Sequence, residues 1–242
     1  QARGAGMTET ISVLVLTHDR LEQVKACFES LVRVRPAFEN LIVVDNASVD
    51  GTEGYVLALP KLTPSAYVWG YGDNLGVARG RQELVKLATR SAFEDILLFL
   101  DSDAIVHSAA LFDTIRAAFE DEAVGVVGIG GSYVDWNQDH PFVPAPVGKC
   151  DVVQGWCMAV RRELFSAVAF DTEYGKFWEE DSDLCMQARK AGFDVVSIDP
   201  AGSITHHPGS SGAHLADRQQ TLARFRMKWQ GLGLTKAEGG YR

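Results

Sequence analysis

The sequence predicts an α/β fold with a Rossmann-like, mostly parallel central sheet, helices on both faces of that sheet, and a less regular second half. Through the first half, continuous apolar runs of strand length alternate with segments of helical periodicity. Such runs indicate strands that are buried on both faces, and their alternation with helices indicates parallel pairing. Each run ends on polar residues, and ligands of such folds bind at the carboxyl ends of the strands.

Four strands and three helices are expected in the first half. The strands are the apolar runs at residues 11–16, 41–44, 67–69 and 96–100. The helices are expected at residues 21–31, 52–59 and 77–89. In the first helix, apolar side chains recur at helical spacing, at Leu21, Val24, Cys27, Phe28 and Leu31. Thr17, Asp45 and Asp101 directly follow three of the strands, so we expect them to line one crevice, although every strand must end in something polar.

The second half contains further strands and helices in a less regular order. Strands are expected at residues 123–129, 152–160 and 195–198, and helices at 161–168, from about 181 to Gly192, and at 216–229. Gly155 lies inside a strand, where a glycine lets another group approach the backbone closely. Gly128, Gly130 and Gly131 lack the strand–loop–helix context of a dinucleotide-binding loop, so that function is excluded.

Length allows one large or two small domains, and a single domain is the favoured interpretation. The chain has 242 residues, 46% of them hydrophobic, and a mean hydropathy of −0.03, which is the composition of a globular protein. The domain is expected over residues 11–232, with a first half at 11–103 and a second half at 104–232. Residues 1–10 are interpreted as a disordered lead-in or a tag remnant, and residues 233–242 as a flexible tail.

The charge balance argues against nucleic acid as a partner. The net charge is −9 and the sequence pI is about 5.1, whereas nucleic-acid binders usually carry a basic face. An anionic substrate would therefore need a metal ion or a few well-placed arginines. The basic segment 216–229 either touches an anionic membrane or packs as a closing helix, and packing is the favoured interpretation.

No stretch of the sequence approaches the roughly 18 consecutive apolar residues of a membrane helix. The four cysteines, Cys27, Cys150, Cys157 and Cys185, form no CxxC pair, so neither a zinc ribbon nor a thioredoxin motif is supported. They are interpreted as reduced thiols, with a Cys150–Cys157 disulfide as the alternative. A cytoplasmic protein is expected, with at most peripheral contact at the inner face of the membrane.

The most informative motif is Asp101-Ser102-Asp103, at the end of the apolar strand at 96–100. In an extended strand, residues two apart point to the same side, so both carboxylates can converge on one site. Carboxylate oxygens are suited to hard divalent ions such as Mg²⁺ and Mn²⁺. The alternative is a turn with two solvated acids, because Asp and Ser are common where strands end.

Two further clusters carry candidate chemistry. Residues 179–183 hold four carboxylates in five residues before a helix. They either favour the helix dipole and cap its amides, or one of them acts as a general base. The pair His206-His207 either occupies a loop or supplies a metal ligand. Arg79, early in the helix at 77–89, either holds a phosphate or is solvated.

Taken together, these segments resemble family 2 glycosyltransferases of the GT-A fold, among them the inverting, non-processive, rhamnosyltransferase-like members. The resemblance runs from about Ile11 to Trp229 in the same order as in the family. It is carried by residues 13–20, 43–52, 74–80, 101–103, 155–156, 170–171, 180–185 and 206–211. Ala169 and Gln187 depart from the pattern, where glycine and arginine are usual. The transmembrane segments and the QxxRW motif of processive synthases are absent from the sequence.

The resemblance implies a donor site in residues 11–103. The donor would be a nucleoside-diphosphate sugar linked to UDP or dTDP. The residues implied for the nucleotide sugar are Thr17, Arg20, Asp45, Asn46, Asn74, Arg79, Asp101 and Ser102. Among them, Asp45 would accept a hydrogen bond from the imide N–H of uracil or thymine.

The resemblance also implies a metal site, a base and an acceptor site. Asp101, Asp103 and His206 would hold Mn²⁺ or Mg²⁺, which would bridge the diphosphate. Asp181 would be the catalytic base that deprotonates the acceptor hydroxyl, and the single displacement would invert the anomeric carbon. A saccharide or lipid-linked glycan acceptor would bind in residues 104–232, against Trp156, Trp178 and Glu180, although both tryptophans equally suit core packing.

Two other functions compete with a glycosyltransferase. A sugar-1-phosphate nucleotidyltransferase would carry a glycine-rich phosphate loop with Arg and Lys near the first strand, and residues 17–20 do not supply one. A non-catalytic nucleotide-sugar-binding module would not need Asp103, Asp181 and His206 together. The oligomeric state and the identity of the sugar are not predicted.

Overall fold

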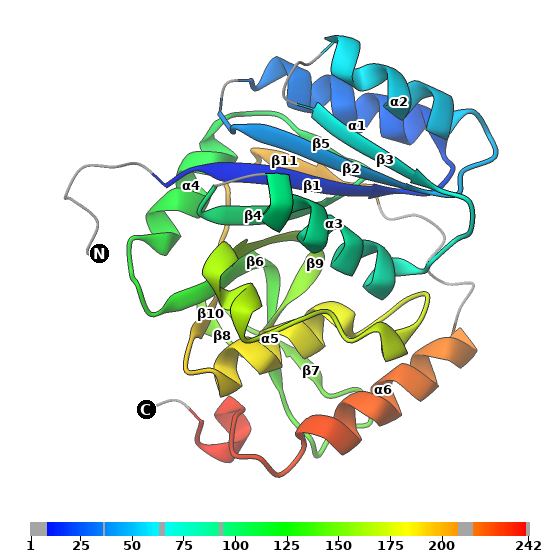
Figure 1. Cartoon of the computed structure of the whole chain (residues 1–242). Helices are drawn as coiled ribbons and strands as arrows, with labels where there is room; N and C mark the ends of the chain where they lie inside the picture. The colour runs from blue at the N-terminus through cyan, green and yellow to red at the C-terminus, as the bar shows by residue number, and fades with distance from the viewer. Residues whose placement is uncertain (1–8, 36, 63–65, 92–93, 208–214, 241–242) are drawn as a thin grey trace.

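The structure is a computed structural model, and it describes residues 9–35, 37–62, 66–91, 94–207 and 215–240. Most of the expected lead-in, residues 1–8, lies outside the described residues, as do residues 208–211 of the motif that begins at His206. Figure 1 shows a central sheet with helices above and below it.

A nine-stranded sheet forms the centre of the molecule, in the order β3-β2-β1-β4-β9-β6-β10-β8, with β7 paired to β6. The first four strands pair in parallel: β1 (Ile11–Thr17), β2 (Asn40–Asn46), β3 (Ala66–Tyr71) and β4 (Ile96–Asp101). The later strands are β6 (Val124–Val134), β7 (Phe142–Pro144), β8 (Gly148–Cys150), β9 (Val152–Arg161) and β10 (Asp194–Ser197). β9 runs antiparallel to β4 and β6, so the sheet is parallel in its first half and mixed beyond it.

Helices cover both faces of the sheet, as predicted. One face carries α1 (Leu21–Arg33), α2 (Thr52–Leu62) and α4 (Ala110–Phe119), and the other carries α3 (Val77–Ser91), α5 (Glu180–Lys190) and α6 (Leu215–Trp229). The apolar run of β1 serves both cores because alternate side chains point to opposite faces. Val13 and Val15 join the core under α1, whereas Leu14 joins the core under α3.

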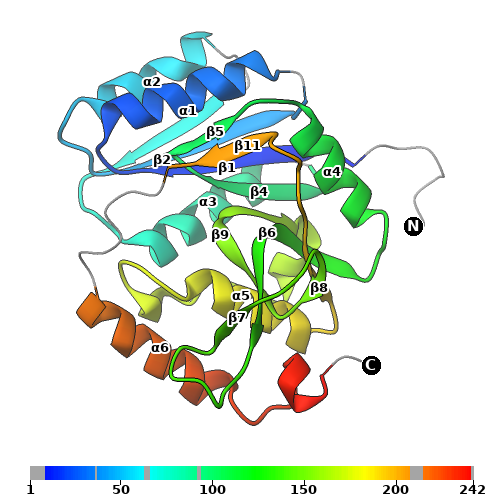
Figure 2. The same cartoon turned by 180° about the vertical axis from the view of Figure 1, so that it is seen from behind.

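No element is predicted for residues 104–122, where the structure has β5 (Ala104–Val106) and α4. β5 pairs with β11 (Ile204–His206) in a small separate sheet, which lies near α1 (Figure 2). β5 and β11 have three residues each, which is too few for the alternation of a strand to be recognised in the sequence. Their pairing in the folded structure alone defines these strands. α4 was recognisable, because its buried residues recur at helical spacing. The helix expected at 161–168 is a shorter 3₁₀ turn at Arg162–Ser166.

The register of the strands brings their polar ends together. Thr17 pairs with Asp45 between β1 and β2, and Leu16 pairs with Asp101 between β1 and β4. Gly80 lets α3 pack closely on this edge, because a Cβ there would lie 2.6 Å from the side chain of Leu16. The first turns of α3 therefore lie directly beside these strand ends.

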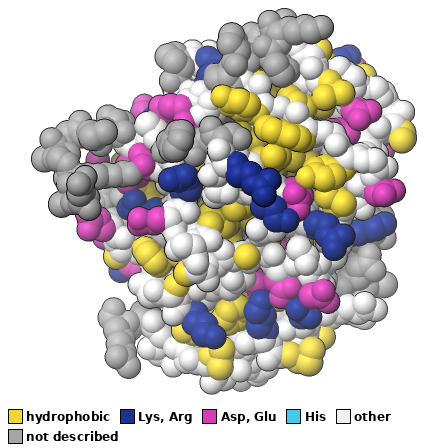
Figure 3. Space-filling view, in the orientation of Figure 1, with side chains coloured by type: hydrophobic (Ala, Val, Ile, Leu, Met, Phe, Trp, Pro, Cys, Tyr) yellow, Lys and Arg dark blue, Asp and Glu magenta, His cyan; other side chains and the backbone are white. Residues whose placement is uncertain are grey.

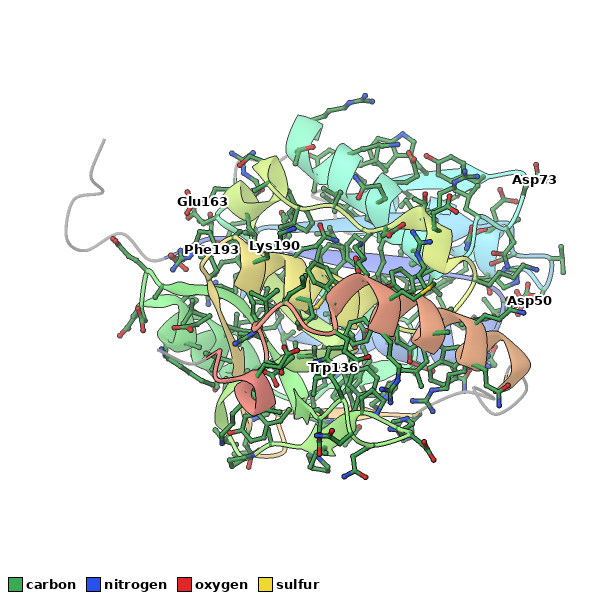
Figure 4. The ribbon with its side chains drawn as sticks, turned by 90° about the horizontal axis from the view of Figure 1, so that it is seen from below. Asp50, Asp73, Trp136, Glu163, Lys190 and Phe193 are labelled. Atoms are coloured by element: carbon green, nitrogen blue, oxygen red, sulfur yellow. The ribbon has the colours of Figure 1, made fainter. Side chains whose placement is uncertain are left out.

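α6 packs as a closing helix, with Phe225 and Trp229 buried in the core under α3 and α5. Figure 4 shows α6 across the molecule with Trp136 close to it, and the ring centroids of Trp136 and Phe225 are 5.5 Å apart.

The flexible tail expected from residue 233 is wrong for residues 233–240. Thr235 is buried, and Arg189 of α5 donates a hydrogen bond to the Leu234 carbonyl at 2.9 Å. The polar tail is ordered by a partner that is distant in sequence.

None of the helices in the described part of the chain combines the length and the apolarity that crossing a membrane requires. All four cysteines are buried and free, so the alternative of a Cys150–Cys157 disulfide is wrong. Burial, and to a lesser extent the charge of Asp101, raises the pKa of Cys157 to about 12, so this thiol stays protonated at neutral pH.

Candidate active site

Asp101, Asp103 and His206 form a compact cluster of potential metal ligands. Asp101 ends β4, Asp103 lies in the turn before β5, and His206 ends β11. One ligand atom from each lies within 4.8 Å of the other two. His206 Nε2 is 3.1 Å from Asp103 Oδ1 and 4.0 Å from Asp101 Oδ2. The pairing of His206 with Ala104 between β11 and β5 brings the histidine to the acidic motif.

Each carboxylate of this cluster offers one oxygen to His206 and the other to an arginine. Asp101 Oδ1 accepts from Arg81 Nη2 at 2.9 Å, and Asp103 Oδ2 is 3.6 Å from Arg20 Nη1. Asp101 Oδ2, Asp103 Oδ1 and His206 Nε2 therefore face one another. Two carboxylate oxygens and one imidazole nitrogen fit a divalent ion of the Mn²⁺ type, whereas Mg²⁺ favours all-oxygen sites.

Trp156 holds His206 in orientation. Their rings are stacked with centroids 4.7 Å apart and planes 1° apart, and the Trp156 indole N–H donates to Gln154 Oε1 at 2.9 Å. One face of Trp156 is therefore covered by the histidine. Sequence reasoning assigns Trp156 to the acceptor, whereas in the structure its closest aromatic contact is with a candidate metal ligand.

Arg81 joins the metal cluster to the acidic segment, and sequence reasoning missed it. Its buried guanidinium donates to Asp101, to Glu180 Oε1 at 3.0 Å and to the Gly155 carbonyl at 2.9 Å. Val77 and Arg81 are four residues apart on α3, and both line the same cavity. Because residues four apart share a helix face, a helix that starts at the strand ends directs position 81 toward them.

Arg79 was the arginine expected here, and the structure does not bring it to the cluster. Its side chain is exposed, like Lys86 and Arg90 of the same helix, and Lys and Arg side chains spread across this part of the surface in Figure 3. Two residues correspond to about 200° around a helix, so positions 79 and 81 point in nearly opposite directions.

Asp181 lies beside Gly155 at the start of α5. The Gly155 N–H donates to Asp181 Oδ2 at 2.6 Å, and the Ser182 N–H donates to Oδ1 at 2.7 Å. A Cβ on Gly155 would lie 2.9 Å from Asp181 Oδ2 and would also meet Arg81 Nη1. The close approach predicted for this strand glycine is therefore real, and the groups that approach are Arg81 and Asp181.

Asp101 and His206 of the metal cluster lie with Asp181 in the wall of one cavity of about 630 Å³. Asp101, His206 and Trp156 form part of this wall, and Glu180 and Asp181 form another part. The wall also includes Ser132 of β6, His140 before β7, Phe142 of β7, Gln154 of β9 and Arg218 of α6. A cavity of this volume is typical of small-molecule sites.

The four carboxylates of residues 179–183 have different environments. Burial raises the pKa of Glu180, outweighing the neighbouring Arg81 guanidinium. Asp183 is fully buried and accepts hydrogen bonds from Tyr174, Trp229 and Lys228, along with Gln187. Asp183 therefore attaches α6 to α5. Gln187, one of the two departures from the family pattern, donates through its amide to the backbone carbonyl of Ala169, the other, at 2.8 Å.

Because of Glu179, we expect the protein to lose stability as the pH rises from about 4.5 to 7. Burial raises its pKa to about 7, although the Thr221 hydroxyl opposes this. Glutamate in an unfolded chain titrates near 4.3, so in this window the folded state binds more protons and the free energy of unfolding falls as pH rises. At roughly 1.4 kcal/mol per pKa unit, the loss is about 3 kcal/mol.

Glu179→Gln should remove this part of the pH dependence. Guanidinium unfolding of both proteins at pH 5 and pH 8 measures it, with the exposed Glu173→Gln as the matched control. An identical change in unfolding free energy for the wild type and Glu179→Gln would contradict the assignment.

The residues predicted for the nucleotide are mutually hydrogen-bonded at the ends of β1 and β2. Asp45 is fully buried and accepts from the Thr17 hydroxyl at 2.8 Å and from the Ser48 N–H at 2.9 Å. Asn46 donates to Asn74 Oδ1 at 3.1 Å. Ser102 is partly exposed in the turn between the two aspartates. Asp45 thus supports the turn that follows β2, and its contact with a nucleobase stays a prediction.

Trp178 lies in the cavity wall just before α5, with left-handed backbone at φ 75°. The guanidinium carbon of Arg218 lies 4.5 Å from the Trp178 ring centroid. This arginine from α6 covers one face of the indole, so a sugar can stack only on the other face. The acceptor role predicted for Trp178 stays a prediction.

Comparison with known proteins first identifies a family. The model described as Glycosyl transferase family 2 matches residues 12–145, which is more than half of the chain. The matched segment contains β1 to β4, α3 and both aspartates of the metal cluster. A search of the curated proteins finds no match.

Solved structures share the fold at low sequence identity. GalNAc-T7 with UDP, GalNAc and Mn²⁺ superposes with a TM-score of 0.71 at 13% identity over 92% of this chain. Mannosyltransferase PcManGT from Pyrobaculum calidifontis, in complex with GDP-Man and Mn²⁺, superposes with a TM-score of 0.72 at 16% identity over 97% of this chain. S. aureus TarS 1-349 superposes with a TM-score of 0.58 at 19% identity over 78% of this chain.

The chain spans 49%, 69% and 58% of the lengths of these three proteins, in the same order. The shared architecture confirms the predicted GT-A fold. With a family model that covers more than half of its length, this chain belongs to glycosyl transferase family 2.

Proposed function

We propose that this chain is an inverting, metal-dependent glycosyltransferase, which moves a sugar from a UDP- or dTDP-linked donor to a hydroxyl of a saccharide or glycoconjugate. The observation that carries the proposal is the single cavity that is lined by Asp101 and His206 of the metal cluster and by Asp181. Two structural neighbours, one with UDP and Mn²⁺ and one with GDP-Man and Mn²⁺, support a nucleotide-sugar donor and a metal ion. The choice of UDP or dTDP rests on Asp45.

Asp101, Asp103 and His206 would hold the divalent ion. When bound, the ion would neutralise charge on the departing nucleoside diphosphate. Arg20 and Arg81 bring positive charge to the same place, within 3.6 Å and 2.9 Å of the two carboxylates. An anionic donor is thereby compensated locally in a protein of net charge −9.

Asp181 would accept the proton of the acceptor hydroxyl. Its two oxygens are oriented by the Gly155 and Ser182 N–H groups, which hold the carboxylate in the cavity wall in the position that a base requires. A single displacement at the anomeric carbon would invert its configuration. The four free thiols support a reducing compartment such as the cytoplasm.

Binding of UDP is expected to depend on Mn²⁺ and on Asp103. Calorimetric titration of UDP with and without Mn²⁺ should show a loss of affinity of about tenfold or more when the ion is removed, and a similar loss in Asp103→Ala. The control is Asp113→Ala, an exposed aspartate on α4. A donor panel that monitors release of nucleoside diphosphate then identifies the sugar.

Three results would speak against this function. UDP binding that is equally tight in excess EDTA would exclude the metal site. Normal turnover by Asp103→Ala would do the same. Metal-dependent UDP binding without release of UDP from any UDP-sugar, alone or with acceptors, would favour a non-catalytic binding protein.

A further inference from the structure

The cavity has a second, cationic region formed by Arg218, His140 and Trp178. Arg218 comes from α6, His140 precedes β7, and Trp178 precedes α5. Burial and then the charge of Arg218 lower the pKa of His140, which is consistent with their proximity. Arg218 also lies over the Trp178 ring at 4.5 Å. Three donor side chains from separate parts of the chain thus meet in one wall.

Two buried donors of this region have no hydrogen-bond partner among the described residues. They are Arg218 Nε and the indole Nε1 of Trp178. Buried polar groups are paired in roughly 90% of cases or more, and an unpaired one costs about 1–3 kcal/mol. Two unpaired donors on adjacent side chains in a cavity wall indicate that a ligand supplies the acceptor oxygens.

The carboxylate nearest to Arg218 neutralises it only partly. Glu179 Oε1 is 3.7 Å from Arg218 Nε, which is beyond hydrogen-bond distance. Its other oxygen accepts from the Thr221 hydroxyl at 2.6 Å. Because burial raises the pKa of Glu179 to about 7, this group is partly protonated at neutral pH. Positive charge therefore remains at Arg218.

Arg81, the other arginine of the cavity wall, has no donor left for a ligand. Arg81 donates to Asp101, Glu180 and the Gly155 carbonyl, so its donors are occupied by the protein. Arg218 is partly accessible, with 31% of its side chain exposed. Within the described wall, Arg218 is the arginine that can accept a new anionic partner.

We infer that the acceptor carries an anionic group, a carboxylate or a phosphate, which Arg218 binds with help from His140 and the Trp178 indole N–H. This inference rests on the proposed function and narrows its acceptor to acidic saccharides, such as those that contain a uronic acid or a sugar phosphate. Arg218 acts here as a specificity-determining residue, whereas the reacting groups lie at Asp181 and the metal cluster.

The test compares neutral and acidic sugars on protein saturated with UDP and Mn²⁺. Binding of glucose, glucuronate and glucose 6-phosphate, and of galactose and galacturonate, is measured by ligand-observed NMR titration. At least one acidic sugar should bind about tenfold or more tightly than its neutral partner, as expected for one charge-assisted hydrogen-bonded pair. Arg218→Gln should abolish this preference, Arg218→Lys should retain part of it, and the exposed Arg90→Gln should leave it unchanged.

UDP affinity in Mn²⁺ is measured in parallel, because the donor diphosphate is the other anion that could reach Arg218. Unchanged UDP affinity in Arg218→Gln, with loss of the preference for acidic sugars, supports the inference. A lower UDP affinity in that variant would assign Arg218 to the donor and overturn it, as would equal or absent binding of all the sugars. Failure of both UDP and dTDP to bind the wild type would instead refute the proposed function.

Discussion

Asp181→Asn is expected to lower the turnover number by roughly 10²- to 10⁴-fold, the usual contribution of a general base. The amide cannot accept the proton of the acceptor hydroxyl. Asp181 contacts neither the metal cluster nor any residue predicted for the nucleotide in the described structure, so UDP affinity in Mn²⁺ should stay within about twofold. The measurement is release of nucleoside diphosphate at saturating donor and acceptor, with a UDP titration alongside.

The asparagine also changes the local hydrogen bonds, and this has to be separated from the chemistry. Both oxygens of Asp181 accept backbone N–H groups, and asparagine can satisfy only one of them. A thermal melt of the variant measures this cost, which is about 1–3 kcal/mol for one unsatisfied group. Normal turnover by a folded Asp181→Asn protein would rule out Asp181 as the base and would direct attention to Glu180.

Arg81→Met is expected to destabilise the protein by about 3–5 kcal/mol, because it removes a buried guanidinium and leaves its three acceptors, on Glu180, Asp101 and Gly155, without that donor. For a chain of this size the melting temperature should fall by roughly 6–20 °C. The same variant frees Asp101 and the Gly155 carbonyl, so Mn²⁺-dependent UDP binding should weaken as well. Differential scanning calorimetry and UDP titration measure the two effects.

Two further variants make this prediction specific. Arg90→Met changes an exposed arginine of the same helix and should alter stability by no more than about 0.5 kcal/mol. Adding Glu180→Gln to Arg81→Met removes the buried carboxyl group that lost its guanidinium partner, so part of the stability should return. If Arg81→Met and Arg90→Met had the same melting temperature, the buried contact between Arg81 and Glu180 would not contribute to stability.

Several features of the site could be predicted because they depend on neighbours in the sequence. The apolar run before Asp101 predicts a buried strand. Because Asp101 follows directly after this run, its carboxylate lies where the strand ends, at the edge of the sheet. Gly155 was expected to accept a close neighbour, because a glycine inside a strand has few other uses. The order of the motifs identified the family, and the family model agrees.

Other features depend on contacts between distant segments. Arg81, and not Arg79, reaches Asp101, because the rotation of α3 about its own axis follows from how Ala78, Leu84 and Val85 pack on the sheet. The four acids at 179–183 look alike in sequence, yet Asp183 binds α6 whereas Asp181 meets Gly155. Trp156 stacks on His206 across some fifty residues, and no local pattern reveals that contact.

Residues close together in the chain are sufficient to predict the alternation of strands and helices, the acidic strand end at 101–103, and membership of the family. Hydrophobic period and turn chemistry act between residues a few positions apart, so they can be recognised in one dimension. The folded structure selects which arginine compensates the aspartates and which arginine is left to bind a ligand, and it brings His206 to the acidic motif. Those choices follow from the β5–β11 register, the rotation of α3 and the docking of α6, and each depends on burying side chains from segments that are far apart in the chain.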